Sequence, residues 1–486
     1  MGYACFTGYG CLMGIGVKIE QVDFFMRNVK TRFPFRYGKA ELVSVPILHA
    51  KMRANVDGNS TEGFSADILP PKWFDKDPNK AYQDNVNDLI LSAQIAADQF
   101  RKVSFAEATP FSLWLRGYNN AIAACRSRRL NGLTASHGCS LMERALIDGV
   151  GKALGQSYFQ LLSEDLIGID LGMIHQKLDG FNFDEFLPKS PLERIQIRHT
   201  VGLSDPLREC NVFEGERVND GLPETLEDYI QRHGLSHFKV KVSGELFADM
   251  KRLGEFSDLV SEIDYTLSLD GNEQFFQMAN FIEFTKQIES ELPSLWDRIS
   301  YIEQPLDRSV ALNDNFSSDI KIISEKKPLL IDESDDSIGS FLRAIELGYL
   351  GISSKSCKGL IKGIANAALV RCQESSRYFM TGEDLMNLPL VPLHQDLVHL
   401  AALGINNIER NGHHYVRGLD HLSLSERQEC LRENADLYSN SNEIQGLRIE
   451  SGTIRVSSLQ RPGLGVGDNV DLDSMVPLPD WDFETL

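Results

Sequence analysis

The chain has 486 residues, of which 42% are hydrophobic and 24% are charged, as in ordinary globular proteins. A chain of this length exceeds one simple core, so we expect two large structural units. The sequence contains 49 basic and 69 acidic residues, giving a formal net charge of −20, which disfavours binding to a phosphate backbone. We therefore expect no nucleic-acid partner and a protein that handles small molecules.

The eight cysteines are scattered and form no Cys-x-x-Cys pair, which is typical of a reducing cytoplasm. Residues 1–16 are rich in glycine and mildly apolar, but they are too short to span a bilayer and no basic segment precedes the apolar part. We expect an irregular N-terminal extension, no membrane partner and a cytoplasmic location.

The first large unit is predicted over residues 17–166. Between residues 17 and 65, short apolar runs alternate with turn signals such as DGNSTEG, which predicts an antiparallel meander. From 82 to 166, apolar residues recur at three- and four-residue spacing, which predicts helices. The unit is therefore α+β, and we interpret residues 167–193 as a linker or covering loop.

From residue 194 onward, short apolar strands alternate regularly with helical stretches, which predicts a parallel sheet. About eight strand-helix units in about 220 residues favour a closed TIM-type (β/α) barrel of seven to eight βα units over a doubly wound sheet. We assign the barrel to residues 194–425, and we expect residues 426–486 to rejoin the N-terminal unit as part of a capping domain. The predicted strands are RIQIRHTVGL, HFKVKV, YTLSLD, ISYIEQP, PLLIDES, LGISSK, YFMTGED and INNIERN.

Charged residues follow five successive predicted strands: Lys241, Asp270, Glu303, Asp332 and Lys355. The carboxyl ends of barrel strands converge on one mouth, so these side chains are expected to form a ring. Three carboxylates without histidine or cysteine suit a hard divalent cation, and Mg²⁺ is favoured because it keeps positions for substrate oxygens. The alternative is that each acid merely caps the helix that follows.

The strand HFKVKV carries Lys239 and Lys241 one residue apart, so both ammonium groups point the same way. Such a pair is costly to bury unless carboxylates or a metal site lie opposite. The alternative is a solvated edge strand, where lysine is common.

Five motifs in order, FKVKV, LSLDGNE, YIEQP, LLIDES and ISSK, resemble the barrel motifs of the enolase superfamily, specifically its mandelate racemase/muconate-lactonising branch. The resemblance covers nearly the whole chain, since PFRYG, DGNSTEGFSAD, ERALIDGVGKALG and RPGLGV resemble the capping-domain segments and the usual ending. It implies an enzyme with a TIM-type barrel, an α+β capping domain, Mg²⁺, a small-molecule carboxylate substrate and a homo-oligomer.

The resemblance also implies roles for single residues. Asp270, Glu303 and Asp332 match the three Mg²⁺ ligands, and Asn272 matches a polar residue beside the metal. Lys241 and Lys355 match acid/base lysines on opposite faces of the substrate, and Lys239 matches a supporting lysine. Two alternatives stay open: Glu333 in place of Asp332, and Lys358 in place of Lys355.

These residue types suit removal of a proton α to a carboxylate. That proton is weakly acidic, so the enediolate must be stabilised as it forms, which a bound Mg²⁺ does electrostatically. A lysine base must be neutral, and its ordinary pKa of about 10.4 must fall through desolvation and a neighbouring cation such as Lys239. A lysine base with Mg²⁺ is a known pattern of this superfamily.

Weaker candidates for substrate contact lie in the expected capping loop and after the last strands: Phe35, Arg36, Tyr37, Glu383, Asp384, His413 and His414. Glu383 and Asp384 could equally cap the next helix, and two adjacent strand residues such as His413 and His414 face opposite ways. The stretch NNIERNGHHYV lacks the Asp-x-Asp pair of dipeptide epimerases, which disfavours that activity.

The leading hypothesis is Mg²⁺-dependent abstraction of a proton α to a carboxylate, followed by racemisation or epimerisation, cycloisomerisation or β-elimination. One alternative is a Schiff-base lyase that uses one of the lysines on the same barrel. Another alternative is a non-catalytic homologue that binds a ligand or partner.

Overall fold

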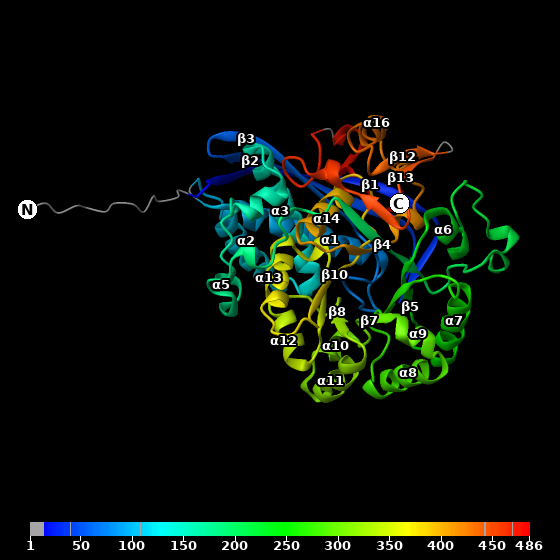
Figure 1. The fold of residues 1–486 in the computed structure, drawn as a ribbon. Helices are drawn as coiled ribbons and strands as arrows, with labels where there is room; N and C mark the ends of the chain where they lie inside the picture. Colours follow the sequence, from blue (N-terminus) through cyan, green and yellow to red (C-terminus); the bar gives the residue numbers. More distant parts are fainter. Residues whose placement is uncertain (1–13, 39, 107, 442–443, 469) are drawn as a thin grey trace, which may run out of the picture.

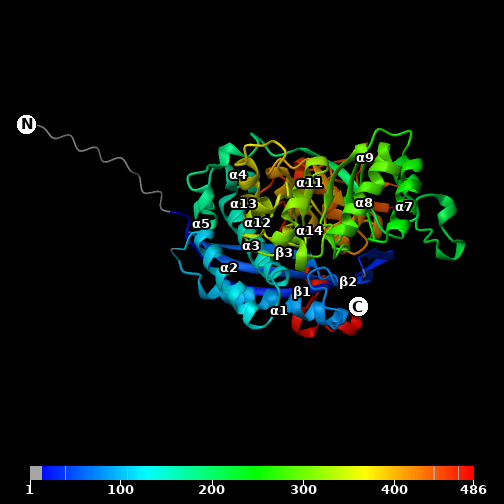
Figure 2. The same cartoon turned by 90° about the horizontal axis from the view of Figure 1, so that it is seen from below.

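The computed structural model describes residues 14–38, 40–106, 108–441, 444–468 and 470–486. Most of the expected N-terminal extension, residues 1–13, lies outside the described residues. The cap, in blue and cyan, covers one side of a barrel that runs from green to orange (Figure 2). No helix in the described part of the chain is long and apolar enough to cross a membrane.

The cap is built on an antiparallel meander, as the sequence predicts. Its strands β1 (Val17–Tyr37), β2 (Ala40–Val56) and β3 (Asn59–Ile68) pair in chain order. Three long helices follow, α1 (Tyr82–Lys102), α2 (Pro110–Ser127) and α3 (Gly132–Leu154). The short helices α4 (Tyr158–Ser163) and α5 (Leu171–Ile174) lead toward the barrel.

Helix α3 is the central helix of the cap. It begins where the Asn131 side chain accepts a hydrogen bond from the Thr134 N–H, and it ends at Gly155 with a left-handed φ of 66°. It packs directly on β3, because a Cβ on Gly63 would lie 1.9 Å from the carbonyl oxygen of Ala145. Only glycine at position 63 permits this approach, which brings the meander and the helix into one core.

Eight parallel strands close into the predicted barrel, since each pairs with the next and the last pairs with the first. All eight predicted strands are present, and the short strand β14 (Thr453–Arg455) adds to the first in antiparallel orientation. The barrel strands are β4 (Arg194–Val201), β5 (His237–Lys241), β6 (Thr266–Asp270), β7 (Ile299–Glu303), β8 (Leu329–Ile331), β9 (Gly351–Ser354), β10 (Phe379–Gly382) and β11 (Asn407–Arg410).

Helices alternate with the strands and surround the barrel (Figure 1). The burial of these helices differs around the barrel. Every residue of α14, which lies under the cap, is buried, whereas α7 exposes one face. The helices are α6 (Leu226–His233), α7 (Leu246–Leu259), α8 (Met278–Glu291), α9 (Pro293–Arg298), α10 (Arg308–Ala311), α11 (Ser317–Lys326), α12 (Ser340–Leu347), α13 (Leu360–Arg371), α14 (Val391–Ala402), α15 (Gly412–Tyr415) and α16 (Leu424–Glu433).

The C-terminal segment returns to the cap, which confirms that part of the predicted fold. After the hairpin of β12 (Tyr438–Ser441) and β13 (Ile444–Leu447), strand β15 (Val476–Pro477) pairs antiparallel with β1. The Arg27 Nη2 of β1 donates to Glu426 Oε2 of α16 at 2.8 Å and to Ser474 Oγ at 2.9 Å. In Figure 1 the red C-terminal segment accordingly lies beside the blue first strand.

Replacing Arg27 by alanine should destabilise the fold, because it leaves the Glu426 carboxylate buried without its cation. The expected loss is about 3 kcal/mol in the free energy of unfolding, measured by urea denaturation. The control is Arg36→Ala, which breaks an ion pair with Glu41 whose two side chains are 51% and 48% exposed and should cost less than about 1 kcal/mol. Equal losses in the two variants would contradict this account of the junction.

Candidate active site

A small cavity of about 40 Å³ lies at the carboxyl ends of the barrel strands, under the cap. The cap contributes an apolar wall and the barrel contributes charged groups, so the cavity has two chemically different sides. Its lining includes Phe35, Tyr37, Leu42, Ile68 and Trp73 from the cap, Leu385 and Met386 after β10, and the polar residues Lys239, Lys241, Asp270, Asn272, Lys355, Asp384, Glu409 and Asn411.

The ammonium group of Lys239 lies among four carboxylates inside the barrel. Its Nζ is 3.0 Å from Asp270 Oδ2, 2.8 Å from Glu303 Oε2, 2.8 Å from Glu383 Oε2 and 3.1 Å from Glu409 Oε2. Burial alone lowers the pKa of Lys239, but the four negative charges outweigh it and raise the pKa well above its usual value. Lys239 is therefore a fixed cation at the centre of the site.

Lys241 projects from the same side of β5 but reaches a different part of the ring. Its Nζ donates to Asp270 Oδ2 at 2.9 Å and to Asn272 Oδ1 at 2.5 Å. Asn272 in turn donates from Nδ2 to Glu333 Oε1 at 3.0 Å, so it bridges a lysine and a carboxylate. Asp270 is thus shared by the two lysines of the Lys-x-Lys pair, which offsets their mutual repulsion.

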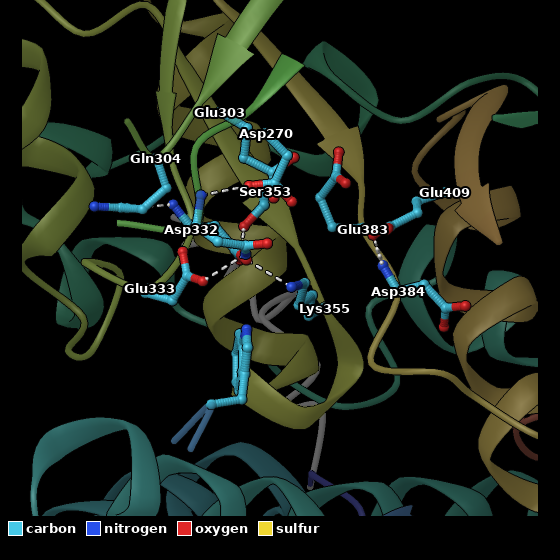
Figure 3. Close-up of polar contacts among 12 residues, drawn as sticks. Asp270, Glu303, Gln304, Asp332, Glu333, Ser353, Lys355, Glu383, Asp384 and Glu409 are labelled. Carbon is cyan, nitrogen blue, oxygen red and sulfur yellow. Dashed lines mark hydrogen bonds and ion pairs between the residues drawn. The ribbon is translucent and has the colours of Figure 1, made fainter. Parts of the chain in front are cut away.

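Lys355, directly after β9, enters the cavity from the other side of the carboxylates (Figure 3). Its Nζ donates to Asp332 Oδ2 at 2.5 Å and lies 4.4 Å from the centre of the Trp73 ring. Burial lowers the pKa of Lys355, but the Asp332 carboxylate together with the charges of Glu303 and Glu409 outweighs burial, so the net pKa is raised. Lys358 also donates to Asp332 Oδ1, at 3.1 Å, yet only Lys355 of the two lines the cavity.

Glu303 is the least satisfied carboxylate of the ring. It is fully buried, and neither of its oxygens accepts a hydrogen bond, although the Lys239 ammonium approaches Oε2. Burial and the neighbouring charges of Asp270 and Glu383 raise the pKa of Glu303 well above its usual value. A buried carboxylate in this situation needs more positive charge than the lysine supplies.

The three carboxylates predicted as metal ligands converge in Figure 3, at the ends of β6 and β7 and after β8. Their donor atoms are hard oxygens, and the unsatisfied Glu303 fits a divalent cation. Asp270 and Asp332, however, are already paired with lysines, and no group of three His, Cys, Asp or Glu residues in the described ranges is arranged to hold a metal ion as it stands. The residue types therefore suit a divalent cation, and lysine ammonium groups lie within 3.0 Å of all three carboxylates.

Glu333 adjoins this group as the alternative ligand. Its Oε2 is buried and accepts no hydrogen bond, while Oε1 accepts one from Asn272. Burial, followed by the charge of Asp332, raises the pKa of Glu333 to about 7. Both Asp332 and Glu333 therefore lie beside the predicted metal site.

The weaker candidates divide into two groups. Tyr37 and Asp384 line the cavity together with Phe35, whereas Arg36 points away from it and pairs with Glu41. Alternation along β1 explains this, since residues 35 and 37 face one way and residue 36 the other. Arg36 is therefore not placed for the substrate contact that the sequence predicts.

His413 and Glu383 also lie elsewhere than expected. His413 belongs to the short helix α15 and not to the last strand, and its Nε2 lies 3.1 Å from His199 Nδ1, outside the cavity lining. Glu383 faces into the barrel, where it holds Lys239 and accepts from Arg198. Both residues lie outside the lining of the cavity, because the chain leaves β11 at Arg410 and because Glu383 is held by Lys239 and Arg198.

The cavity residues that sequence reasoning missed include Glu409, Asn411 and Trp73. Glu409 is the residue before the last in β11, and burial raises its pKa less than the charges of Lys239, Lys241 and Lys355 lower it, so its pKa falls. In the sequence Glu409 stands near the end of the predicted strand INNIERN, in the same kind of position as the other acids. Asn411 has a buried Oδ1 without a partner, and Trp73 comes from a loop after β3. No local pattern marks Trp73, because only the fold brings it to the barrel.

Replacing Lys239 by methionine should destabilise the protein far more than replacing Lys241 by methionine. The first change leaves four buried carboxylates without their common cation, at a cost of at least about 3 kcal/mol, whereas Asp270 keeps Lys239 after the second change. Calorimetric unfolding in EDTA measures both variants. A Lys239→Met protein as stable as Lys241→Met would show that Lys239 does not organise the ring.

By sequence, the chain matches no protein-family model and no curated protein. Among solved structures, N-succinyl Arg/Lys racemase from Bacillus cereus is similar with a TM-score of 0.60 and 16% identity, over 96% of this chain and 98% of that chain. An enolase from Bradyrhizobium complexed with magnesium and mandelic acid gives 0.57 and 16%, over 95% and 99%. Muconate lactonizing enzyme from Pseudomonas fluorescens, complexed with muconolactone, gives 0.55 and 14%, over 93% and 97%. The chain therefore has the fold of the enolase superfamily, as its barrel motifs predict.

Proposed function

We propose that the protein is an enzyme that removes a proton α to the carboxylate of a small molecule with the help of Mg²⁺. The enediolate so formed is reprotonated in a racemisation or epimerisation, or it proceeds to cycloisomerisation or β-elimination. One observation carries the proposal: Lys241 and Lys355 enter one capped cavity from strands that are not neighbours, beside three carboxylates. The similar structures named as a racemase and a lactonizing enzyme support the same reaction class.

Asp270, Glu303 and Asp332 would hold the cation, with Glu333 as the alternative to Asp332. When bound, Mg²⁺ supplies the positive charge that stabilises an enediolate as it develops. Glu303 contributes a carboxylate without hydrogen bonds, and Asn272 orients Lys241 beside Asp270. Lys239 stays protonated, and its positive charge stabilises the negative charges of the surrounding carboxylates.

Lys241 and Lys355 are the proposed proton-transfer groups. A lysine acts as a base only when neutral, whereas the Asp332 carboxylate now holds the Lys355 proton. With Asp332 as a ligand of the cation, its carboxylate would raise the pKa of Lys355 less, and burial would favour the neutral amine. Lys355 can then take a proton at Nζ on one side of the cavity, and Lys241 can return one from the other side.

The cavity lining indicates what the substrate carries beside its carboxylate. Phe35, Trp73 and Met386 form an apolar wall that excludes water, and the buried Oδ1 of Asn411 is a free acceptor for an N–H or O–H group. Asp384 accepts hydrogen bonds from Arg410 and two backbone N–H groups, so its carboxylate is not free to bind a substrate ammonium group. A cytoplasmic location and a homo-oligomer stay predictions from the sequence.

Incubation in deuterium oxide with N-acyl amino acids and hydroxy acids, mandelate included, should give metal-dependent deuterium incorporation at the α-carbon of one class. In the Lys241→Ala, Lys355→Ala double variant, the exchange rate measured by mass spectrometry should fall at least about 100-fold, because both proton-transfer groups are gone. Lys326→Ala, at an exposed ion pair with Glu289, is the matched control and should retain the rate.

Exchange that survives undiminished in the double variant would refute the proposed mechanism. Trapping of a carbonyl substrate by borohydride, without a requirement for metal, would instead favour the Schiff-base lyase. Failure to bind Mg²⁺, together with no exchange for any acid, would favour a non-catalytic homologue.

A further inference from the structure

The barrel is open between β10 and β11 at the end opposite the candidate active site. These strands share one residue pair, which joins Gly382 at the carboxyl end of β10 to Ile408, the second residue of β11. A cavity of about 500 Å³ lies beside the amino-terminal residues of the two strands. Its lining includes Thr266, Phe379 and Asn407, the first residues of β6, β10 and β11.

Arg198 of β4 spans this opening and replaces the missing strand pairing. Its Nη1 donates to Asn407 Oδ1 of β11 at 2.6 Å, and its Nη2 donates to the Gly382 carbonyl oxygen of β10 at 3.0 Å. The guanidinium also lies 5.5 Å from the ring of Tyr301. The remaining nitrogen, Nε, is buried and has no hydrogen-bond partner among the residues that the structure describes.

A second buried polar atom without a partner lines the same cavity. Ser268 of β6 is 1% exposed, and its Oγ makes no hydrogen bond. The adjoining pairing of β6 and β7 shifts register between Leu267 and Ser268, so the sheet is irregular at this point. A buried donor left unpaired costs about 1–3 kcal/mol, and this cavity holds one on Arg198 and one on Ser268.

The charge and shape of the cavity define what would satisfy these atoms. The charged side chains of its lining are Arg198 and Arg371, and the lining contains no carboxylate. Phe379, Met380, Leu403 and Ile405 are partly exposed toward it, forming an apolar wall. The volume is that of a typical small-molecule site. A carboxylate accepts from both donors, while an aromatic or branched body covers the apolar wall.

We propose that the cavity between β10 and β11 binds an organic monocarboxylate, whose oxygens accept hydrogen bonds from Arg198 Nε and Ser268 Oγ and whose apolar body packs on Phe379 and Leu403. This site is separate from the carboxylate ring at the other mouth and does not depend on the reaction proposed there.

The site is linked to the candidate active site through Glu383. Glu383 Oε1 accepts hydrogen bonds from Arg198, from Tyr301 Oη at 3.2 Å and from Thr381 Oγ1 at 2.9 Å, and all three donors line the cavity. Its other oxygen, Oε2, accepts from Lys239 at 2.8 Å. A ligand bound to Arg198 would therefore lie one side chain away from the carboxylate that holds Lys239.

Calorimetric titration with benzoate, an aromatic monocarboxylate, tests the proposal. Benzoate should bind at least ten-fold more tightly than benzyl alcohol, which lacks the charge. Ala367→Trp fills the cavity from α13 and should weaken benzoate binding at least ten-fold, and Ser268→Ala should weaken it several-fold. Ser376→Trp, on an exposed turn outside the lining, is the matched control and should leave binding unchanged. Circular dichroism verifies that each variant is folded.

Crystals soaked with 4-bromobenzoate locate the ligand by the anomalous signal of bromine. The proposal requires a bromine peak between β10 and β11 in the wild type and none there in Ala367→Trp. Benzoate binding that Ala367→Trp leaves unchanged, a bromine peak confined to the carboxyl-end mouth, or no saturable binding would each overturn the proposal.

Discussion

A lysine ammonium buried in a barrel needs negative charge around it, and Lys239 has four carboxylates within 3.1 Å. Much of the polar architecture follows from this interaction. Asp270 and Glu409 also line the cavity, while Glu303 at the end of β7 and Glu383 directly after β10 contact the lysine outside the cavity lining. Because like charges at such distances repel strongly in a poorly solvated interior, neither the lysine nor the carboxylates could be buried without the other.

The same interaction connects the two ends of the barrel. Glu383 binds Lys239 with one oxygen and Arg198 with the other, and Arg198 in turn bridges the opening between β10 and β11. A usual barrel interior is filled by branched apolar side chains. Here a column of charged groups replaces part of that filling, so a change of charge at one mouth reaches the other through three side chains in contact.

The fold was largely predictable from the sequence, because the alternation of apolar strands and helices is a local signal. The ends of β5 to β9 were predictable for the same reason, since strand-end residues follow directly from strand positions. The partners of Lys239 were not, because Glu383 and Glu409 reach it from strands more than 140 residues away. Trp73 belongs to a loop without periodicity, and the direction of the Lys355 pKa shift depends on Asp332, whose contact only the folded chain reveals.

The central claim is that the carboxylate ring is one positive charge short at Glu303 and accepts a divalent cation there. Diffraction from crystals soaked in Mn²⁺, which replaces Mg²⁺ and scatters anomalously, tests this claim directly. We expect an anomalous peak in contact with Glu303 and with the carboxylates of Asp270 and Asp332, and a Lys355 ammonium displaced from Asp332. No peak at saturating Mn²⁺, with Lys239 and Lys355 still holding these carboxylates, would contradict it.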